Sequence, residues 1–188
     1  MDKKIIFVHG YTASSQADWY PAIRPELDKL GVNYSIPDLP GGEHPHSADW
    51  ISIIKKEVEK TTKPVVLVGH SLGTRAVLLY LDKYQKPVDT VILIAPLSND
   101  ITNRERRGGE PFPDFFEYKI NLQQVKKLAN KFVIMHSKDD DSLDYEQHGV
   151  SLAKELEINL ITFDKVGHFC DSKCAPVILS VLRKELKF

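Results

Sequence analysis

Short runs of apolar residues alternate along the chain with longer stretches in which apolar residues recur every three or four positions. The short runs are rich in Val and Ile and almost continuously apolar, which is typical of strands buried on both faces of a parallel sheet. They predict strands at residues 4–8, 33–36, 65–68, 90–94, 132–135 and 159–163.

The longer stretches between these runs predict helices at residues 19–30, 47–59, 72–84, 122–129, 144–156 and 175–186. The second of them brings four apolar side chains to one side at helical spacing: Trp50, Ile51, Ile54 and Val58. Strands that alternate with helices indicate βαβ units with right-handed crossovers. The pattern therefore predicts a three-layer α/β fold, in which helices cover both faces of a doubly wound sheet.

Residues 96–118 interrupt this alternation. The segment contains two adjacent glycines, three prolines and four consecutive charged residues at 104–107, which predicts a long irregular loop. Long loops are often lids or binding loops, so a lid over a functional site is an open alternative.

The chain has 188 residues, which suits one domain over residues 1–188. A net charge of −1 and the lack of a long basic run argue against a nucleic-acid partner. No apolar run approaches the roughly 20 residues that a membrane helix needs. Cys170 and Cys174 lie four positions apart, which is poor disulfide geometry. A cytoplasmic protein with free thiols is expected.

The most informative motif is Gly69-His70-Ser71-Leu72-Gly73, between an apolar run and a predicted helix. A G-x-S-x-G sequence in a strand–turn–helix setting is typical of a nucleophilic serine on a tight turn, and the glycines leave room for that turn. Ser71 is therefore the candidate nucleophile. The Leu72 N–H, at the helix N-terminus, is a candidate donor to an oxyanion. A chance match in a glycine-bearing turn is the alternative.

A serine nucleophile needs a base and a carboxylate that orients the base. Candidates for both follow the last two predicted strands: Asp139 and Asp140 come after residues 132–135, and His168 comes after residues 159–163. The carboxyl ends of parallel strands meet at one edge of a sheet, where ligands bind. Ser71, an aspartate and His168 are therefore expected together, with either aspartate as the acid.

The first predicted strand ends in Val8-His9-Gly10-Tyr11, which resembles the H-G-x turn of hydrolases. In that turn the residue after glycine donates a second N–H to the oxyanion, which assigns this role to Tyr11. The side chain of His9 is interpreted first as a packing histidine under the turn, with contact to substrate as the alternative.

The segments VHGYTASS, WYP, GHSLG, SKDD and GHF together resemble the small lidless α/β-hydrolases of the YdeN and retinoblastoma-binding-protein-9 type, over residues 5–186. The resemblance implies an α/β-hydrolase fold without a large cap domain, with about six parallel strands in the order 2-1-3-4-5-6. It also implies a Ser71–Asp140–His168 triad. Asp144 stands where the family frequently has proline, so Asp139 is kept as the fallback acid.

These observations lead to the expectation of a serine hydrolase, a carboxylesterase that acts on small acyl esters through an acyl-serine intermediate and needs no cofactor. An acyltransferase, a peptidase or a protein-binding module that kept the fold is the alternative. The expected partner is a small acyl substrate, without nucleic acid or membrane, and the expected state is a monomer or weak homodimer.

Aromatic residues near the predicted site are candidate substrate contacts, although core packing is the default for such side chains. The candidates are Trp19 and Phe169, together with His9. A metal site is not expected: a calcium site would need six to eight oxygen ligands, and a structural zinc site four ligands. The weaker alternative of a site at His168, Cys170 and Cys174 would use the candidate base as a ligand.

Overall fold

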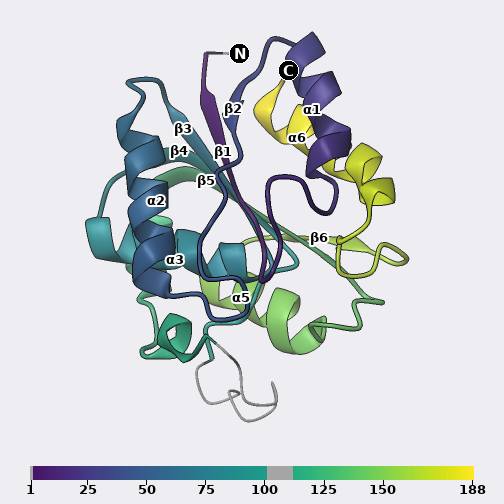
Figure 1. Cartoon of the computed structure of the whole chain (residues 1–188). Coiled ribbons are helices and arrows are strands. Elements are labelled where there is room, and N and C mark those ends of the chain that lie inside the picture. Colours follow the sequence, from purple (N-terminus) through teal and green to yellow (C-terminus); the bar gives the residue numbers. More distant parts are fainter. Residues whose placement is uncertain (1, 101–111) are drawn as a thin grey trace.

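A computed structural model describes residues 2–100 and 112–188. Within these residues, six strands form one parallel sheet in the order β2-β1-β3-β4-β5-β6 (Figure 1). The strands are β1 (Lys4–Val8), β2 (Asn33–Ser35), β3 (Val65–His70), β4 (Val88–Ile94), β5 (Ala129–Ser137) and β6 (Leu160–Phe163). The predicted fold class and strand order are confirmed.

The register of the sheet brings the carboxyl ends of the central strands together. Val8 at the end of β1 pairs with Gly69 in β3, and His70 pairs with Ile94 at the end of β4. Ser137 at the end of β5 pairs with Phe163 at the end of β6. The loops that follow these strands therefore leave the sheet at one edge.

The helices are α1 (Tyr20–Lys29), α2 (Ser47–Glu59), α3 (Leu72–Tyr84), α4 (Leu122–Lys126), α5 (Ser151–Leu156) and α6 (Ala175–Leu186). The predicted bounds of α2, α3 and α6 are confirmed. The prediction of a helix over 122–129 is too long, because Ala129 already pairs with Val88 in the sheet. The predicted helix at 144–156 is divided into a π-helical turn, η3 (Glu146–Val150), and α5.

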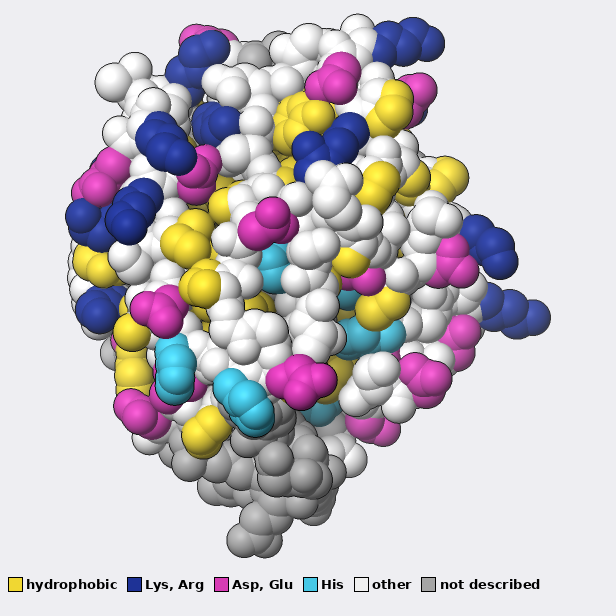
Figure 2. Space-filling model, viewed as in Figure 1, with side chains coloured by type: hydrophobic (Ala, Val, Ile, Leu, Met, Phe, Trp, Pro, Cys, Tyr) yellow, Lys and Arg dark blue, Asp and Glu magenta, His cyan; other side chains and the backbone are white. Residues whose placement is uncertain are grey.

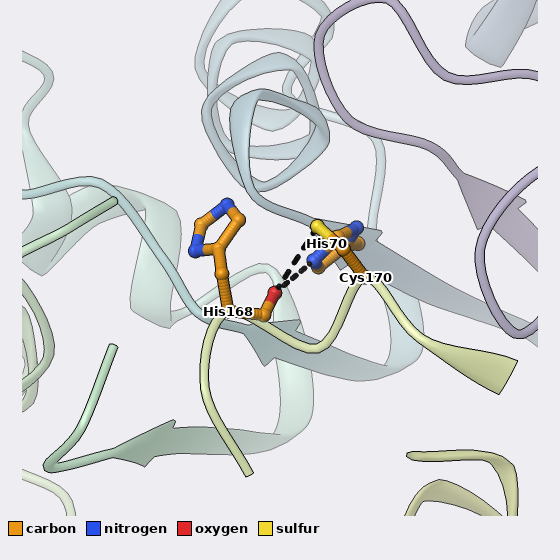
Figure 3. Close-up of side chains that lie close together, drawn as sticks. All are labelled: His70, His168 and Cys170. Atoms are coloured by element: carbon orange, nitrogen blue, oxygen red, sulfur yellow. Dashed lines mark hydrogen bonds between the residues drawn. The ribbon is translucent and has the colours of Figure 1, made fainter. Parts of the chain in front are cut away.

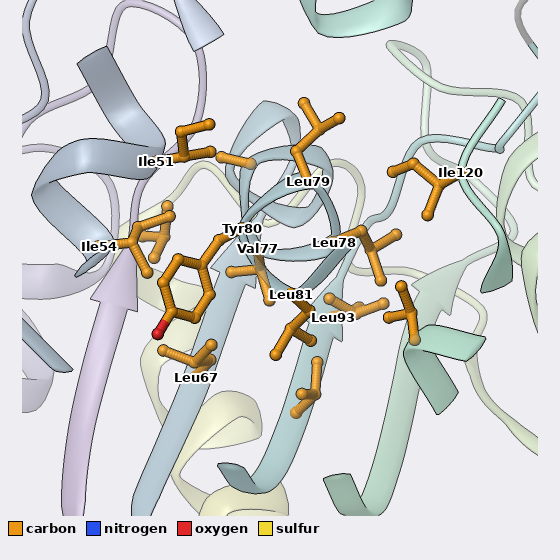
Figure 4. Close-up of a cluster of buried hydrophobic side chains, with 14 of the residues drawn as sticks. Ile51, Ile54, Leu67, Val77, Leu78, Leu79, Tyr80, Leu81, Leu93 and Ile120 are labelled. Atoms are coloured by element: carbon orange, nitrogen blue, oxygen red, sulfur yellow. The ribbon is translucent and has the colours of Figure 1, made fainter. Parts of the chain in front are cut away.

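Helices cover both faces of the sheet. The strands divide their side chains between the two faces with a period of two: in β1, Ile5 and Phe7 pack with α1 and α6, whereas Ile6 and Val8 pack with α2 and α3. Figure 1 shows α1 and α6 together on one side and α2 with α3 on the other. Figure 4 shows apolar side chains of α3 meeting those of α2 and the sheet, which buries the helix that follows Ser71.

The described parts of segment 96–118 are packed against the body of the protein. A short 3-10 helix, η2 (Pro113–Phe116), contributes the fully buried Phe115 and Phe116. The guanidinium of the buried Arg75 in α3 donates to the carbonyl oxygens of Phe115 and Tyr118 at 2.8 and 2.7 Å. The prediction of an irregular loop is thus wrong for this helical turn. Residues 101–111, which include the charged run at 104–107, lie outside the described residues.

Among the described residues, no helix combines the length and the apolar character that crossing a bilayer requires.

Candidate active site

Ser71 occupies the sharp turn between β3 and α3. Its backbone has φ 51° and ψ −123°, a conformation that costs a non-glycine residue about 1–3 kcal/mol. The glycines of the motif permit the turn sterically. A Cβ on Gly69 would lie 2.8 Å from the Gly73 carbonyl oxygen, and a Cβ on Gly73 would overlap the carbonyl of Val8. The start of α3 can therefore lie directly against β1 and β3.

A chain of hydrogen bonds runs from Ser71 through His168 to Asp140. The Ser71 hydroxyl lies 2.9 Å from His168 Nε2, and His168 Nδ1 lies 2.7 Å from Asp140 Oδ2. A carboxylate can only accept, so Nδ1 carries the proton and Nε2 accepts from the serine. The structure thus brings together three residues that the sequence placed after β3, β5 and β6.

Asp139, the fallback acid, makes different contacts. Its Oδ1 accepts hydrogen bonds from the Ser137 hydroxyl and from the backbone N–H groups of Val166 and Gly167. These bonds hold the loop that precedes His168. In the described geometry Asp140, and not Asp139, is the carboxylate that contacts the His168 ring.

The carboxylate of Asp140 is fully buried and accepts four hydrogen bonds. Besides His168, Oδ2 accepts from His136 Nε2 at 2.9 Å, and Oδ1 accepts from the N–H groups of Ser142 and Leu143, each at 2.9 Å. Burial alone would raise the pKa of Asp140, but the bonds from His136, His168 and Leu143 outweigh it and hold the pKa well below its ordinary value. Asp140 therefore stays ionised.

Tyr11 and Leu72, the predicted oxyanion donors, belong to segments that lie next to Ser71. Leu72 is the first residue of α3, where a backbone N–H has no acceptor within the helix. Gly10, at the end of β1, lies so close that a Cβ there would be 3.1 Å from Ser71 Cβ. That approach brings Tyr11 to the cleft, and the structure places Tyr11 and Leu72, the two predicted oxyanion donors, in its wall.

The cleft has a volume of about 770 Å³. One part of its wall is apolar and includes Leu72, Leu97, Phe112 and Leu143; another part is polar and includes Asp18, His70, His168 and Cys170. A second hollow of about 590 Å³ shares four lining residues with the cleft: Asp18, Ser142, His168 and Cys170. Figure 2 shows histidine and acidic side chains across the lower middle of one face of the molecule, whereas Lys and Arg lie in its upper part and at its sides.

His9 does not line the cleft. Its ring is buried, and its Nε2 accepts a hydrogen bond from the N–H of Leu39 at 2.9 Å, while the ring packs edge-on against Trp50. Burial lowers the pKa of His9. This placement agrees with the interpretation as a packing histidine: the side chain holds the loop before α2 and does not face the cleft.

Trp19 and Phe169 are also buried in the core, with no exposed surface. Trp19 packs against Phe7, and Phe169 packs edge-on against Phe163. Neither lines the cleft, so their predicted contact with substrate has no support in this structure. The packing of α1 and α6 against one face of the sheet takes up both rings.

Sequence reasoning missed three residues that shape the site. His136 supports Asp140, and Asp18 and His70 lie in the cleft wall. A positional signal existed for each: His70 is inside the serine motif, His136 directly precedes SKDD, and Asp18 directly precedes WYP. Their roles depend on neighbours distant in sequence, so local pattern alone did not identify them.

His70 is held in one tautomer by the residue that carries the candidate base. Its Nε2 lies 2.8 Å from the His168 carbonyl oxygen, which can only accept, so Nε2 carries the proton. Burial, followed by the charge of His168, lowers the pKa of His70 to about 3. His70 is therefore neutral at physiological pH.

His70, His168 and Cys170 form a cluster whose candidate ligand atoms lie within 4.8 Å of one another (Figure 3). The donor set does not fit a resident metal, because both ring nitrogens of His168 and Nε2 of His70 already make hydrogen bonds.

Loss of solvent around the thiol, followed by the charge of Asp18, raises the pKa of Cys170 to about 12, although the residue as a whole is exposed. Cys170 and Cys174 are both free thiols, as predicted.

The strand order, the helices on both faces and the serine turn at the carboxyl edge define an α/β-hydrolase fold. Residues 5–174 match the family model described as serine hydrolase, and the chain belongs to that family.

YdeN of Bacillus subtilis (strain 168) is 25% identical to this chain over 187 residues, which cover 97% of this chain and 95% of YdeN. The crystal structure of the ydeN gene product superimposes with a TM-score of 0.85 at 23% identity, covering 99% of this chain and 100% of that chain.

Two further solved structures share the fold at lower identity. Est1E of Butyrivibrio proteoclasticus with bound ferulic acid has a TM-score of 0.74 at 20% identity, covering 98% of this chain and 88% of that chain. The methylesterase protein MES16 of Arabidopsis has a TM-score of 0.74 at 16% identity, covering 98% of this chain and 99% of that chain.

Proposed function

We propose that the protein is a carboxylesterase that hydrolyses small acyl esters, with Ser71 as nucleophile, His168 as general base and Asp140 as the acid that orients it. The observation that carries the proposal is the hydrogen-bond chain from Ser71 through His168 to the ionised Asp140, at 2.9 and 2.7 Å, opening onto the cleft.

In the first half-reaction, Ser71 Oγ attacks the ester carbonyl carbon and its proton passes to His168 Nε2. The tetrahedral intermediate collapses when His168 gives this proton to the leaving alkoxide oxygen, and the alcohol departs. Water then attacks the acyl-serine and gives a proton to His168, which returns it to Ser71 as the carboxylic acid leaves. Asp140 keeps the proton of His168 on Nδ1 throughout and stabilises the imidazolium. No redox group or cofactor is needed for these steps.

The N–H groups of Tyr11 and Leu72 are proposed to bind the oxyanion of the tetrahedral intermediate. They act where negative charge develops, so they stabilise the transition state more than the ground state. Each such donor contributes on the order of 3 kcal/mol in comparable sites.

The size of the cleft suits a small ester better than a bulky substrate. A volume of about 770 Å³ is within the range of small-molecule sites. An ester is also the least demanding acyl substrate for a serine nucleophile. Two proteins with this fold, a methylesterase and Est1E with bound ferulic acid, are consistent with ester chemistry in this fold.

Labelling by a fluorophosphonate probe tests the nucleophile. The wild type should be labelled, and Ser71→Ala should not be. Ser142→Ala is the matched control, because Ser142 also lines the cleft but its hydroxyl donates to Asp141, whereas the Ser71 hydroxyl lies beside His168 Nε2. Hydrolysis of p-nitrophenyl butyrate should fall by at least about 10⁴-fold in Ser71→Ala. A wild type that is neither labelled nor active would overturn the proposal and favour a binding module.

A further inference from the structure

Two hydrogen-bond acceptors face each other in the cleft wall on the side of His168. The carboxylate oxygen Oδ2 of Asp18 lies 3.7 Å from Nδ1 of His70. Since the proton of His70 is on Nε2, Nδ1 has only its lone pair to offer. His70 is 1% exposed, and its Nδ1 has no hydrogen-bond partner among the described residues. A buried acceptor without a donor is costly, so this pair of atoms fits a ligand that brings N–H groups.

The carboxylate of Asp18 has no cation near it in the described part of the cleft. Its side chain keeps 14% of its surface exposed, so a ligand can reach it. His70 stays neutral, because burial lowers its pKa to about 3. The described walls of the cleft and the adjoining hollow contain no Lys or Arg, whereas they contain four aspartates: Asp18, Asp141, Asp144 and Asp171. A cation therefore finds no like charge in these walls.

The position of Asp18 relates it to the leaving group of an ester. In the proposed mechanism His168 gives its proton to the leaving oxygen, so the leaving alcohol occupies the His168 side of the cleft. Asp18 and His168 belong to the wall that the cleft shares with the adjoining hollow, together with Ser142 and Cys170. The apolar wall at Leu97 and Phe112 is then available to the acyl group.

We propose that Asp18 and His70 form a subsite for a primary ammonium group on the leaving alcohol of the ester substrate. The inference deepens the proposed esterase function and rests on it. A primary ammonium carries one positive charge and three N–H donors. One N–H donates to the Asp18 carboxylate and a second to His70 Nδ1. A quaternary ammonium has the charge but no N–H, so it satisfies only the electrostatic half of the subsite.

A matched series of butyrate esters tests the subsite. The leaving alcohols are 4-aminobutanol, its trimethylammonium analogue and 1-pentanol, which replaces the ammonium by a methyl group of similar size. In the wild type, kcat/KM should be about tenfold higher for the 4-aminobutyl ester than for the pentyl ester, with the trimethylammonium ester between them. In Asp18→Asn, the ratio of kcat/KM for the 4-aminobutyl ester to kcat/KM for the pentyl ester should fall to about one.

Asparagine suits position 18, because the backbone there has φ 53° and Asn, like Asp, tolerates this left-handed conformation. The matched control is Asp144→Asn, which removes a negative charge from the same cleft at a residue away from His70. A subsite requires that only Asp18→Asn abolishes the preference. An equal loss in both variants would mean a general negative field and would overturn the subsite.

The pH dependence of the ratio provides an independent readout. Burial raises the pKa of Asp18 to about 6, with the charge of His168 acting in the opposite direction. The preference for the 4-aminobutyl ester should therefore decline as pH falls through about 6. A pH effect on the catalytic steps that the two esters share cancels in the ratio. His70, Tyr20, Cys170 and Cys174 around Asp18 are kept neutral by their surroundings. Asp141 and Asp171 line the adjoining hollow with Asp18, and the hydrogen bond from the Lys173 N–H lowers the pKa of Asp171.

Failure of the subsite and failure of the esterase proposal give different results. Hydrolysis of both esters at equal rates, with fluorophosphonate labelling intact, overturns the subsite and leaves the esterase standing. If neither ester is hydrolysed and no labelling occurs, the esterase proposal fails. In that case an NMR titration with 4-aminobutanol still decides the subsite, because shifts near Asp18 should appear in the wild type and vanish in Asp18→Asn. No shifts in the wild type would overturn it.

Discussion

Asp140 and Asp18 are two carboxylates close to His168, yet their surroundings shift their pKa values in opposite directions. Asp140 is completely buried and accepts four hydrogen bonds, which hold its pKa far below the usual range. Asp18 is more exposed, but the nearest polar atom described for it is another acceptor, and burial raises its pKa to about 6. The supply of hydrogen-bond donors, more than burial, decides which carboxylate keeps its charge.

The two carboxylates also have different proposed functions within one cleft: Asp140 orients His168, and Asp18 binds the substrate. At Asp140 the protein itself satisfies every lone pair that the geometry presents, so the group is fixed and suited to orient His168. At Asp18 the protein leaves acceptors open towards the cleft, as a binding subsite requires. The predictions below test this division, from the largest expected effect to the smallest.

Replacing Asp140 by Asn should have the largest effect on catalysis. Asparagine has one acceptor oxygen, and if that oxygen meets the N–H groups of Ser142 and Leu143, its N–H2 group faces His168. His168 then loses the acceptor that keeps its proton on Nδ1. We expect kcat to fall by about 10⁴-fold, the loss typical of this change in a serine triad. Steady-state hydrolysis of p-nitrophenyl butyrate measures it. Asp139→Asn is the control: its amide oxygen can still accept from the loop before His168, and kcat should change by less than about tenfold. Comparable losses in both variants would contradict the assignment of Asp140.

His136 should influence the rate only through Asp140. Its Nε2–H donates to Asp140 Oδ2 at 2.9 Å, and a side chain on Gly149 would overlap its ring, so the imidazole is tightly enclosed. A hydrogen bond to a charged group contributes about 1.5–3 kcal/mol. His136→Ala should therefore lower kcat by roughly 10- to 100-fold with KM little changed.

A conservative variant distinguishes orientation of Asp140 from general packing. In His136→Gln, the amide N–H2 can take the place of Nε2–H and should restore much of kcat. Equal losses in the Ala and Gln variants, accompanied by equal losses of thermal stability, would show that His136 acts by packing alone.

The two carboxylates should affect folding stability with opposite dependence on pH. The folded-state pKa of Asp18 is raised above its ordinary 3.8, so between about pH 4 and 6 the folded state binds more protons than the unfolded state, and stability falls as pH rises. Asp140 has a depressed folded-state pKa, so its contribution is present above the unfolded-state pKa and is lost as pH falls.

Asp18→Asn should therefore stabilise the protein at pH 8, where the charge is desolvated, and not at pH 4, where most Asp18 is protonated in the folded state. After allowance for solvent screening the gain is about 1 kcal/mol, or roughly 2–4 °C in Tm. Thermal unfolding at both pH values measures it. A gain of the same size at pH 4 would mean that charge is not the cause.

The sequence predicted the fold well because the relevant signals are local. Continuous apolar runs marked the buried strands, and helical spacing marked α2, α3 and α6 with correct bounds. The setting of GHSLG after one run and before one helix predicted the turn at Ser71, since tight turns impose strict steric demands on nearby residues. The errors at Ala129 and at η3 fall where pairing with a distant strand or a change of helix type overrides local pattern.

The sequence by itself determined the parallel sheet, the serine turn and the edge at which Ser71, an aspartate and His168 would meet, because alternating strands and helices leave few topologies open. Only the tertiary structure decided which aspartate contacts His168, buried His9, Trp19 and Phe169 in the core, and brought Asp18 within 3.7 Å of His70. These outcomes depend on side-chain directions and on hydrogen bonds between segments that are far apart in the chain. Local sequence patterns do not specify either of them.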